Sequence, residues 1–303
     1  MKISVIIPAH NCAKYIAQTL NCIQTQTFPT KNIEVIIVLD GCTDNTADII
    51  NDFVATHPQL RVHTIVHDAP TGPGIARNDG VRAAHGDYIH FMDADDIINT
   101  EFYERLYAAV TQTDCDVAVA GLVNEGAPES NILFHTTQVV SCAPDKFSAT
   151  QVDMWGFSVR YLIRRAFWNK LKLSFPTDII YAEDVFPMVQ MVYAARSIVL
   201  VPGAEYTYKC RPSSLLHSPD RAGRSASDIM TVRRRVDEFL VRHDLPRSGV
   251  PMVRMKYKLF GVIPLLTYRT TDARMYDTFY LFGIIPILKK RVSRYIKPWK
   301  IKI

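Results

Sequence analysis

The stretch GPGIARNDGVRAAHGDYIHFMDADD, residues 72–96, decides the fold of this chain. It opens on two glycines around a proline and continues as the helical segment Pro73–His85. It then passes through the apolar strand Tyr88–Met92 and ends in Asp93-Ala94-Asp95-Asp96. A helix that leads directly into a buried strand is typical of α/β domains. The acidic cluster at the end of that strand indicates a ligand site, because parallel sheets bind ligands at the carboxyl ends of their strands.

The alternation of strand and helix extends on both sides of this stretch. Apolar β-branched runs predict strands, and apolar residues at helical spacing predict helices. The expected strands are Ile3–Ile7, Ile33–Leu39, Arg61–Val66, Tyr88–Met92 and Val117–Ala120, and the expected helices are Ala13–Gln26, Asn45–Thr56, Pro73–His85 and Glu101–Thr111. The fold class is therefore α/β, with a parallel sheet covered by helices on both faces.

The second half of the chain has a weaker pattern. Residues 121–153 are polar and irregular. Farther along, helices are expected at Tyr181–Ala195 and Arg221–His243, and short strands at Ile198–Val201 and Glu205–Lys209. In the tail, LFGVIPLL (Leu259–Leu266) matches LFGIIPIL (Leu281–Leu288), a repeat too short for a solenoid.

Composition bounds the class of protein. The chain has 303 residues, 48% of them hydrophobic and 21% charged, as expected for a globular protein with a buried core. No run of eighteen apolar residues predicts a transmembrane helix, and the N-terminus lacks the apolar segment of a signal peptide. The six cysteines form no CxxC pair, which favours reduced thiols over a zinc site or a disulfide framework.

Charge is distributed unevenly along the chain. Residues 251–303 carry twelve Lys and Arg against two acids, a net charge of +10, whereas the rest of the chain carries −5. Basic residues beside aliphatic and aromatic ones, with Trp299 among them, suit the surface of an anionic bilayer. The alternative is a helical subdomain that packs on the body and exposes a solvated basic face. Nucleic acid is not an expected partner, since no recognition motif accompanies the charge.

Two turns in the first half suit a nucleotide. In Asp40-Gly41-Cys42-Thr43-Asp44-Asn45-Thr46, Asp40 can accept a hydrogen bond from a base N–H, Gly41 permits a tight turn, and Asp44 or Asn45 can cap the next helix. In Gly72–Asn78, glycines precede a helix whose N-terminus favours an anion, and Arg77 adds positive charge. The first turn alone is equally typical of an ordinary capped βα turn. The second matches neither GxxxxGK[ST] nor GxGxxG, which argues against a P-loop or dinucleotide site.

Two acidic groups suit catalysis. Asp93, Asp95 and Asp96 repel one another unless a cation lies among them, and open oxygen coordination suits Mg²⁺ or Mn²⁺. The alternative is a solvated turn before the helix at Glu101, and some such structural role is expected for Asp96. Glu183-Asp184 lies in partly apolar surroundings, which raise the pKa of a carboxylate and make it a competent base. Two acids at a helix N-terminus, favoured by the helix dipole, are the alternative.

Together, these motifs resemble the family 2 glycosyltransferases, which have a GT-A type fold. The resemblance rests on four segments at Val5–Asn11, Val38–Thr46, Gly72–Asp96 and Tyr181–Pro187. It implies a Rossmann-like, mostly parallel sheet flanked by helices, followed by a helical, basic C-terminal extension. The implied domains are a catalytic domain at 1–220, with a nucleotide-sugar half at 1–120 and an acceptor half at 121–220, and the extension at 221–303.

The resemblance also assigns roles. The nucleotide-sugar site would comprise Pro8, Asn11, Asp40, Gly74, Arg77, Asp93, Ala94 and Asp95. Asp40 would read the base, Arg77 would lie beside the donor diphosphate, and Asp93 would face the ribose. Mn²⁺ or Mg²⁺ would bind Asp95 and Asp93, with His217 as a further candidate ligand or, alternatively, an ordinary surface histidine. Asp184 would be the catalytic base and Glu183 its neighbour.

The resemblance is incomplete at two positions. His10 stands where the family usually has Tyr, and Cys42 stands where it usually has Ser. The QxxRW pattern of processive members is absent, which favours the transfer of one sugar per encounter.

The implied function is inverting, metal-dependent transfer from a nucleotide diphosphate donor, a UDP-sugar, to a glycan or lipid-linked acceptor in lipopolysaccharide or capsule synthesis. The alternatives are a catalytically silent nucleotide-sugar-binding protein at the membrane and a sugar nucleotidyltransferase. The expected location is the cytoplasm, with peripheral contact at the inner membrane through the basic tail.

Overall fold

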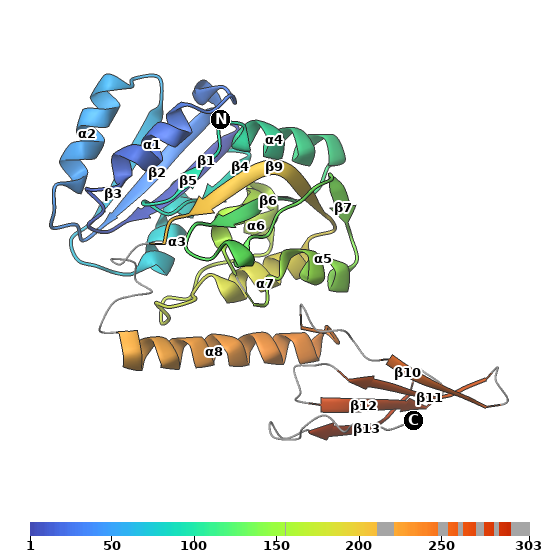
Figure 1. Cartoon of the computed structure of the whole chain (residues 1–303). Coiled ribbons are helices and arrows are strands. Elements are labelled where there is room, and N and C mark those ends of the chain that lie inside the picture. The colour runs from blue at the N-terminus through green and yellow to red at the C-terminus, as the bar shows by residue number, and fades with distance from the viewer. Residues whose placement is uncertain are drawn as a thin grey trace.

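In the computed structural model, residues 1–154, 156–210 and 226–247 are described with their side chains. For residues 221–225 and for four strands between residues 254 and 291, the backbone alone is described. The chain forms one large sheet between two layers of helices, and a long helix and a small second sheet follow in the sequence (Figure 1).

Four parallel strands make up the first half of the large sheet. They are β1 (Ile3–Ala9), β2 (Ile33–Asp40), β3 (Arg61–His67) and β4 (Tyr88–Phe91), in the spatial order β3-β2-β1-β4. β1, β2 and β4 are almost wholly buried, as their unbroken apolar sequences require, whereas the edge strand β3 alternates between exposed and half-buried residues. Their shared direction brings four carboxyl ends to one edge of the sheet.

The second half of the sheet is mixed. It consists of β6 (Val117–Asn124), β8 (Tyr161–Arg164) and β9 (Ile198–Tyr208), with the short strands β5 (Ile97–Ile98) and β7 (Gln138–Val140) paired to β9. β6 and β9 are parallel, but β8 runs antiparallel to both of its neighbours. The fully parallel sheet expected from the strand-helix alternation is therefore found only in the first half.

β9 is one strand where the sequence predicts two. Its pairing with β6 shifts register between Val119 and Gly121, opposite the segment that holds Gly203 with a φ of 72°. This bulge interrupts the apolar pattern without ending the strand.

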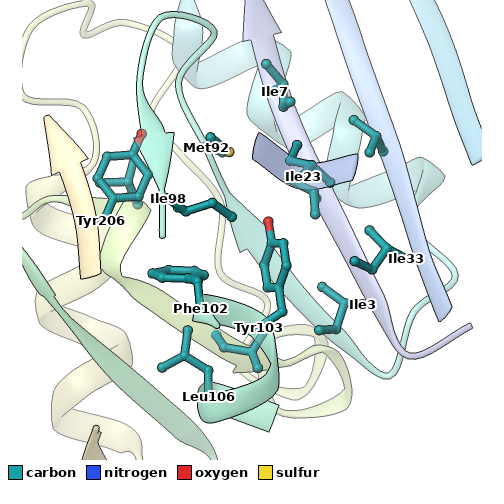
Figure 2. Packing of buried hydrophobic residues seen from close by; sticks show 14 of the residues in the cluster. Ile3, Ile7, Ile23, Ile33, Met92, Ile98, Phe102, Tyr103, Leu106 and Tyr206 are labelled. Atoms are coloured by element: carbon teal, nitrogen blue, oxygen red, sulfur yellow. The ribbon is translucent and has the colours of Figure 1, made fainter. Parts of the chain in front are cut away.

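Helices cover both faces of the sheet. One layer holds α1 (Ile16–Gln24), α2 (Thr46–Thr56) and α4 (Phe102–Thr113), and the other holds α3 (Pro73–Ala83), α5 (Ala143–Thr150), α6 (Arg165–Lys170), α7 (Val185–Ala194) and α8 (Arg221–Arg242) (Figure 1). Figure 2 shows the buried cluster between the sheet and the layer of α1, α2 and α4, where Phe102, Tyr103 and Leu106 of α4 pack beside Ile3 and Ile98.

The expected α/β class is confirmed. All six cysteines are free thiols.

α8 packs against the helices on one face of the large sheet. Its Val232, Val236 and Leu240 belong to the same buried cluster as Met188 of α7. The helix that the sequence assigns to the start of the extension therefore shares a core with the first 220 residues.

The tail differs from the expected helical extension. Beyond α8, the described backbone forms an antiparallel sheet of β10 (Arg254–Leu259), β11 (Ile263–Thr270), β12 (Tyr276–Leu281) and β13 (Ile285–Arg291). The expectation is correct for α8 and wrong for these strands. Each copy of the LFGxIP repeat joins the end of one strand to the start of the next, and the surrounding Tyr, Thr, Ile and Phe residues favour strands. Over the described residues, no helix combines the length and the apolar character needed to cross a membrane.

Candidate active site

Side chains join the ends of β1 and β2 into one unit. Asn11, which has a φ of 48°, accepts the backbone N–H of Thr43 through Oδ1 over 2.8 Å. Asp44 accepts the N–H of Ala13 and the N–H of Thr46, each over 3.1 Å. Thr46 is the first residue of α2 and Asn45 is its N-cap, so Asp44, one residue earlier, satisfies a backbone N–H at the start of the helix.

Asp40 is held at the end of β2 by a ring of donors. Its Oδ1 accepts the N–H and the hydroxyl of Thr71 over 2.8 and 2.7 Å, and its Oδ2 accepts the N–H of Gly72 over 2.8 Å. Burial raises the pKa of Asp40, but these hydrogen bonds and one from His67 outweigh burial, so the net pKa lies below the ordinary value. Asp40 is therefore an ionised acceptor in a fixed orientation.

His67 is a site residue that the motifs did not include. Its Nδ1 lies 2.8 Å from Asp40 Oδ1, and its Nε2 lies 2.9 Å from Oδ2 of Asp79 on α3. The signal in the sequence was its position directly after the third expected strand, where ligand-binding residues gather. His10 also contributes, since its Nδ1 donates to the Asp40 carbonyl over 2.6 Å. The histidine in the first motif thus ties β1 to β2.

Arg77 is enclosed between two carboxylates. One terminal nitrogen donates to Glu183, and the other donates to Asp93 Oδ1 over 2.8 Å. Burial lowers the pKa of Arg77, but the charges of Asp93 and Glu183 raise it more, so the guanidinium stays charged. The sequence predicted that Arg77 lies beside the donor diphosphate. In the structure each terminal nitrogen contacts a carboxylate, so Arg77 positions the two acidic groups, and its place beside a diphosphate stays a prediction.

One member of the acidic cluster after β4, Asp96, has a structural role. Asp96 is buried, and it accepts the hydroxyl of Tyr206 and the N–H of Lys209, each over 2.8 Å. The same Tyr206 hydroxyl accepts the N–H of Asp93 over 3.1 Å. The structural role expected for Asp96 is therefore confirmed. Burial raises the pKa of Asp96 well above its ordinary value, and the charges of Asp93 and Asp95 add to this rise.

A divalent cation fits the chemistry of this cluster. Burial is the main cause of the raised Asp96 pKa, and the charges of Asp93 and Asp95, which a cation would neutralise, add to it. In the part of the chain with described side chains, no three His, Cys, Asp or Glu residues gather into a complete metal site. Mg²⁺ and Mn²⁺ use one or two carboxylates and complete their shells with water and substrate phosphates, so two aspartates suit them. The third predicted ligand, His217, lies outside the described residues.

Glu183 and Asp184 have different surroundings. Glu183 is buried against Arg77, whereas Asp184 is half-buried and accepts the N–H of Ser158 through Oδ2 over 2.9 Å. Burial raises the pKa of Glu183 to about 7, with Arg77 lowering it and Asp184 raising it. Burial also raises the pKa of Asp184, against the lowering effects of Arg77 and the Ser158 N–H. Asp184 is thus the more accessible carboxylate and has a proton affinity above that of an ordinary aspartate.

Contacts of three helices stabilise the segment that carries Glu183 and Asp184. Asp184 is the residue before α7, and Lys146 of α5 donates to the carbonyls of Tyr193 and Ala195 at the other end of α7. Asp228 of α8 accepts the N–H groups of Ile180 and Tyr181 over 3.0 and 3.2 Å, which fixes the loop before Glu183. The position of the pair therefore depends on α5, α7 and α8 together.

Glycines allow the close packing of this site. A Cβ added at Gly74 would lie 2.8 Å from the carbonyl oxygen of Pro176 and 3.5 Å from Glu183 Cγ. A Cβ at Gly156 would lie 2.5 Å from the Val185 Cα and 3.0 Å from Asp184 Oδ1. Gly74 was predicted as a nucleotide-sugar residue, and its missing side chain makes room for the protein's own backbone.

Hydrogen bonds link several of the predicted site residues, either directly or through α3. The Asp40 carboxylate binds the N–H of Gly72, which directly precedes α3, and Arg77 of α3 joins Asp93 to Glu183. The charge of Asp93 also raises the pKa of Asp184, so the two acidic groups act on each other. Ala94 is buried and offers its carbonyl to Thr19 over 2.9 Å, and Pro8 lies half-buried on β1.

A family model described as Glycosyl transferase family 2 matches residues 4–174. Glycosyltransferase GlyG of Streptococcus pneumoniae is 28% identical over 71% of this chain and 73% of its own length. Uncharacterized glycosyltransferase EpsJ of Bacillus subtilis is 28% identical over 72% of this chain and 63% of its own length. Poly(ribitol-phosphate) beta-N-acetylglucosaminyltransferase TarS of Staphylococcus aureus is 30% identical over 82% of this chain. The matched part spans 42% of TarS, so much of that protein has no counterpart here.

Solved structures have a similar fold. The crystal structure of S. aureus TarS 1-349 in complex with UDP-GlcNAc has a TM-score of 0.69 and 26% identity, over 82% of this chain and 68% of that one. Mannosyltransferase PcManGT from Pyrobaculum calidifontis, in complex with GDP-Man and Mn²⁺, has a TM-score of 0.55 at 19% identity, over 80% of this chain and 64% of that one. The latter likeness concerns the fold alone.

Proposed function

The chain belongs to glycosyl transferase family 2, and on that premise we propose that it moves one sugar from a UDP-sugar to an acceptor hydroxyl, with inversion and with the help of a divalent cation. The observation that carries this proposal is the contact of Arg77 with both Asp93 and Glu183, which unites a cation-binding cluster and a basic carboxylate pair in one site. The names of the relatives support a bacterial surface glycan as the product.

The uridine assignment rests on Asp40. An ionised carboxylate only accepts hydrogen bonds, so it suits a base edge that presents an N–H, as the imide of uracil does. Hydrogen bonds from Thr71 and Gly72 fix its orientation before any ligand binds. The likeness to TarS in complex with UDP-GlcNAc supports the same choice of base.

Asp95 and Asp93 are the residues that would hold Mg²⁺ or Mn²⁺. Such an ion, when bound, stabilises the negative charge that develops on a departing diphosphate. Arg77 keeps Asp93 in position by donating to its Oδ1, and Tyr206 supports the same turn by accepting the Asp93 N–H. These protein contacts prepare the cluster for the ion and for the donor ribose.

Asp184 is our candidate for the base. Its Oδ2 is fixed by the Ser158 N–H, and its Oδ1 lies beside Gly156. It removes the proton from the acceptor hydroxyl, whose oxygen attacks the anomeric carbon from the face opposite the diphosphate. The C–O bond to the donor breaks as the new C–O bond forms, so the configuration inverts. Glu183 pairs with Arg77 and lies next to Asp184, so its negative charge favours the proton-accepting role of Asp184.

Nucleotide-sugar binding and product analysis test this proposal. The full chain is heated with UDP-, GDP- and ADP-sugars, with Mn²⁺ or with EDTA. A true donor raises Tm by mass action, and we expect this for UDP-sugars with Mn²⁺ alone. Transfer to an alcohol acceptor, followed by NMR of the product, then gives the stereochemistry. The absence of stabilisation by any nucleotide sugar would refute the donor assignment, and a retained anomeric configuration would refute inversion.

The nucleotidyltransferase alternative has little support. Such an enzyme needs a glycine-rich loop with a basic residue soon after the first strand. β1 instead ends in Pro8-Ala9 and is followed by His10-Asn11, and Asn11 is bound to Thr43. The silent-binder alternative leaves the raised pKa values of Glu183 and Asp184 without a use.

The tail suits an acceptor at a lipid surface. Its net charge of +10 over residues 251–303 would be attracted to anionic lipid. Co-sedimentation of the full chain with vesicles tests this, and we expect binding to anionic vesicles that is lost when Lys289, Lys290 and Arg291 are replaced by Gln. Equal sedimentation with neutral and anionic vesicles would contradict it.

A further inference from the structure

We infer that His67 is a positioning residue for recognition of the nucleobase, through its contacts with Asp40 and Asp79. The inference rests on the proposed function, because it needs Asp40 to face the base of the donor. It adds a residue from outside the four motifs and ties base recognition to helix α3.

The geometry makes His67 a bridge. The parallel register of β2 and β3 ends on the pair Asp40 and His67, so the two side chains leave the sheet side by side. Nδ1 lies 2.8 Å from Asp40 Oδ1, and Nε2 lies 2.9 Å from Asp79 Oδ2. Each ring nitrogen of His67 therefore lies within hydrogen-bond distance of one carboxylate oxygen. The His67 side chain is 13% exposed, which leaves the ring little freedom to turn.

Other groups around the ring support the same arrangement. The Thr71 hydroxyl lies 3.0 Å from Nδ1 and donates to Asp40 Oδ1. Asp79 also pairs with Arg82, one turn farther along α3. Two carboxylates and one arginine therefore face or flank the imidazole, and the contact with Arg82 helps to hold Asp79 in position.

His67 differs from the other donors to Asp40 in what it is attached to. Thr71 and Gly72 both belong to the loop before α3, so their hydrogen bonds move with that loop. His67 belongs to β3 and is also held by Asp79 in the second turn of α3. It is thus the donor that fixes the Asp40 carboxylate relative to a strand and a helix at once. Oδ1 is occupied by His67 and Thr71, and Oδ2, which accepts the N–H of Gly72, is the oxygen left to meet a base.

The test separates base recognition from general loosening of the site. Calorimetry with Mn²⁺ measures the Kd of UDP and of inorganic diphosphate for wild type, His67→Phe and His63→Phe. His63 lies on the same strand and is exposed, so its variant is the matched control. A hydrogen bond to a charged acceptor, such as the one from a base to the Asp40 carboxylate, is worth enough that its loss weakens binding about 10-fold or more. We expect His67→Phe to raise the Kd of UDP by that factor and to leave the Kd of diphosphate within about 2-fold. His63→Phe should match wild type.

Equal UDP affinity in His67→Phe and wild type overturns the inference, as does an equal loss of UDP and diphosphate affinity. If wild type binds diphosphate but not UDP, the proposed function fails instead, and the two failures are thereby distinguished. Should His67→Phe not fold, Asp79→Leu removes the Nε2 partner and should shift the Kd of UDP in the same direction, whereas Asp79→Asn keeps an acceptor and should remain close to wild type. No difference between these two Asp79 variants would overturn the inference as well.

Discussion

The backbone N–H of Ser158 donates to Asp184 Oδ2 over 2.9 Å, so the candidate base is oriented by a short turn rather than by another catalytic side chain. That turn is fixed from β4, because Nε2 of the buried His90 donates to the carbonyl of Val159 over 2.8 Å. Burial lowers the pKa of His90 to about 4, so this link stays neutral over the range in which most enzymes work. The strand that leads to Asp93 thus also positions Asp184.

Replacing the base should stop turnover without unfolding the protein. A positioned general base contributes about 10² to 10⁴ in rate, so we expect Asp184→Asn to lose about that factor in kcat. Asn keeps an oxygen for the Ser158 N–H, and Tm should change little. Asp178→Asn is the control, since Asp178 is an exposed partner of Arg235 on the loop before the acidic pair. Turnover of Asp184→Asn within 3-fold of wild type, on the order of 0.7 kcal/mol, would remove Asp184 from the role.

Removing the metal-binding aspartate should uncouple the donor from the cation. We expect Asp95→Ala to abolish the increase in UDP affinity that Mn²⁺ gives to wild type, because Asp95 would hold the ion that neutralises the charge of the diphosphate. Calorimetry with and without Mn²⁺ measures this difference. Asp87→Ala, at an exposed aspartate before β4, should keep the full effect of Mn²⁺. Identical Mn²⁺ dependence in Asp95→Ala and wild type would contradict the assignment.

Removing the buried arginine should cost both stability and activity. Arg77→Met leaves Asp93 and Glu183 without their shared partner, and breaking a buried ion pair costs about 3–5 kcal/mol. Urea unfolding measures this loss. Arg105→Met, which breaks an exposed pair with Glu101, should cost no more than about 1 kcal/mol. A loss for Arg77→Met as small as that of the control would show that the two carboxylates do not depend on Arg77.

Glu183 should make stability fall as the pH rises. Its pKa is about 7 in the folded protein against an ordinary 4.5, so the folded state holds a proton that the unfolded state releases in this range. The stability contributed by this group is complete below pH 4.5 and is lost as the pH rises through 7. His90 acts in the opposite direction, because its folded pKa is the lower one.

A difference between variants isolates the effect of Glu183. The free energy of unfolding of wild type minus that of Glu183→Gln should decrease from pH 4.5 to pH 7, whereas the same difference for Glu104→Gln, at an exposed glutamate, should stay flat. Parallel curves for wild type and Glu183→Gln would contradict the raised pKa.

The sequence predicted the first half of the fold better than the second for a physical reason. β1, β2 and β4 are buried on both faces, so their sequences are unbroken apolar runs that stand out between amphipathic helices. β7 and β8 have three and four residues, and their positions depend on pairing with distant strands. Nothing in a run as short as Tyr161–Arg164 specifies an antiparallel partner.

Asp40 and Asp93 were predictable because they lie where strands end. The partners of the acidic residues were less so, since hydrogen bonds such as the one from Ser158 to Asp184 or from Tyr181 to Asp228 join distant parts of the chain. The contacts of Arg77 were hidden for the same reason. A motif shows that a positive charge is present, but only the fold shows that two carboxylates already surround it.

Helix α3 lies against β1 so closely that a methyl group at Gly80 would overlap Ile6. This close packing restricts movement of the helix along the strand. The helix carries Asp79, which contacts His67 beside Asp40, and Arg77, which contacts Asp93. Attempts to retune this enzyme for another nucleotide would alter a part that also sets the spacing of its reacting groups. Donor preference and rate should consequently be difficult to engineer independently.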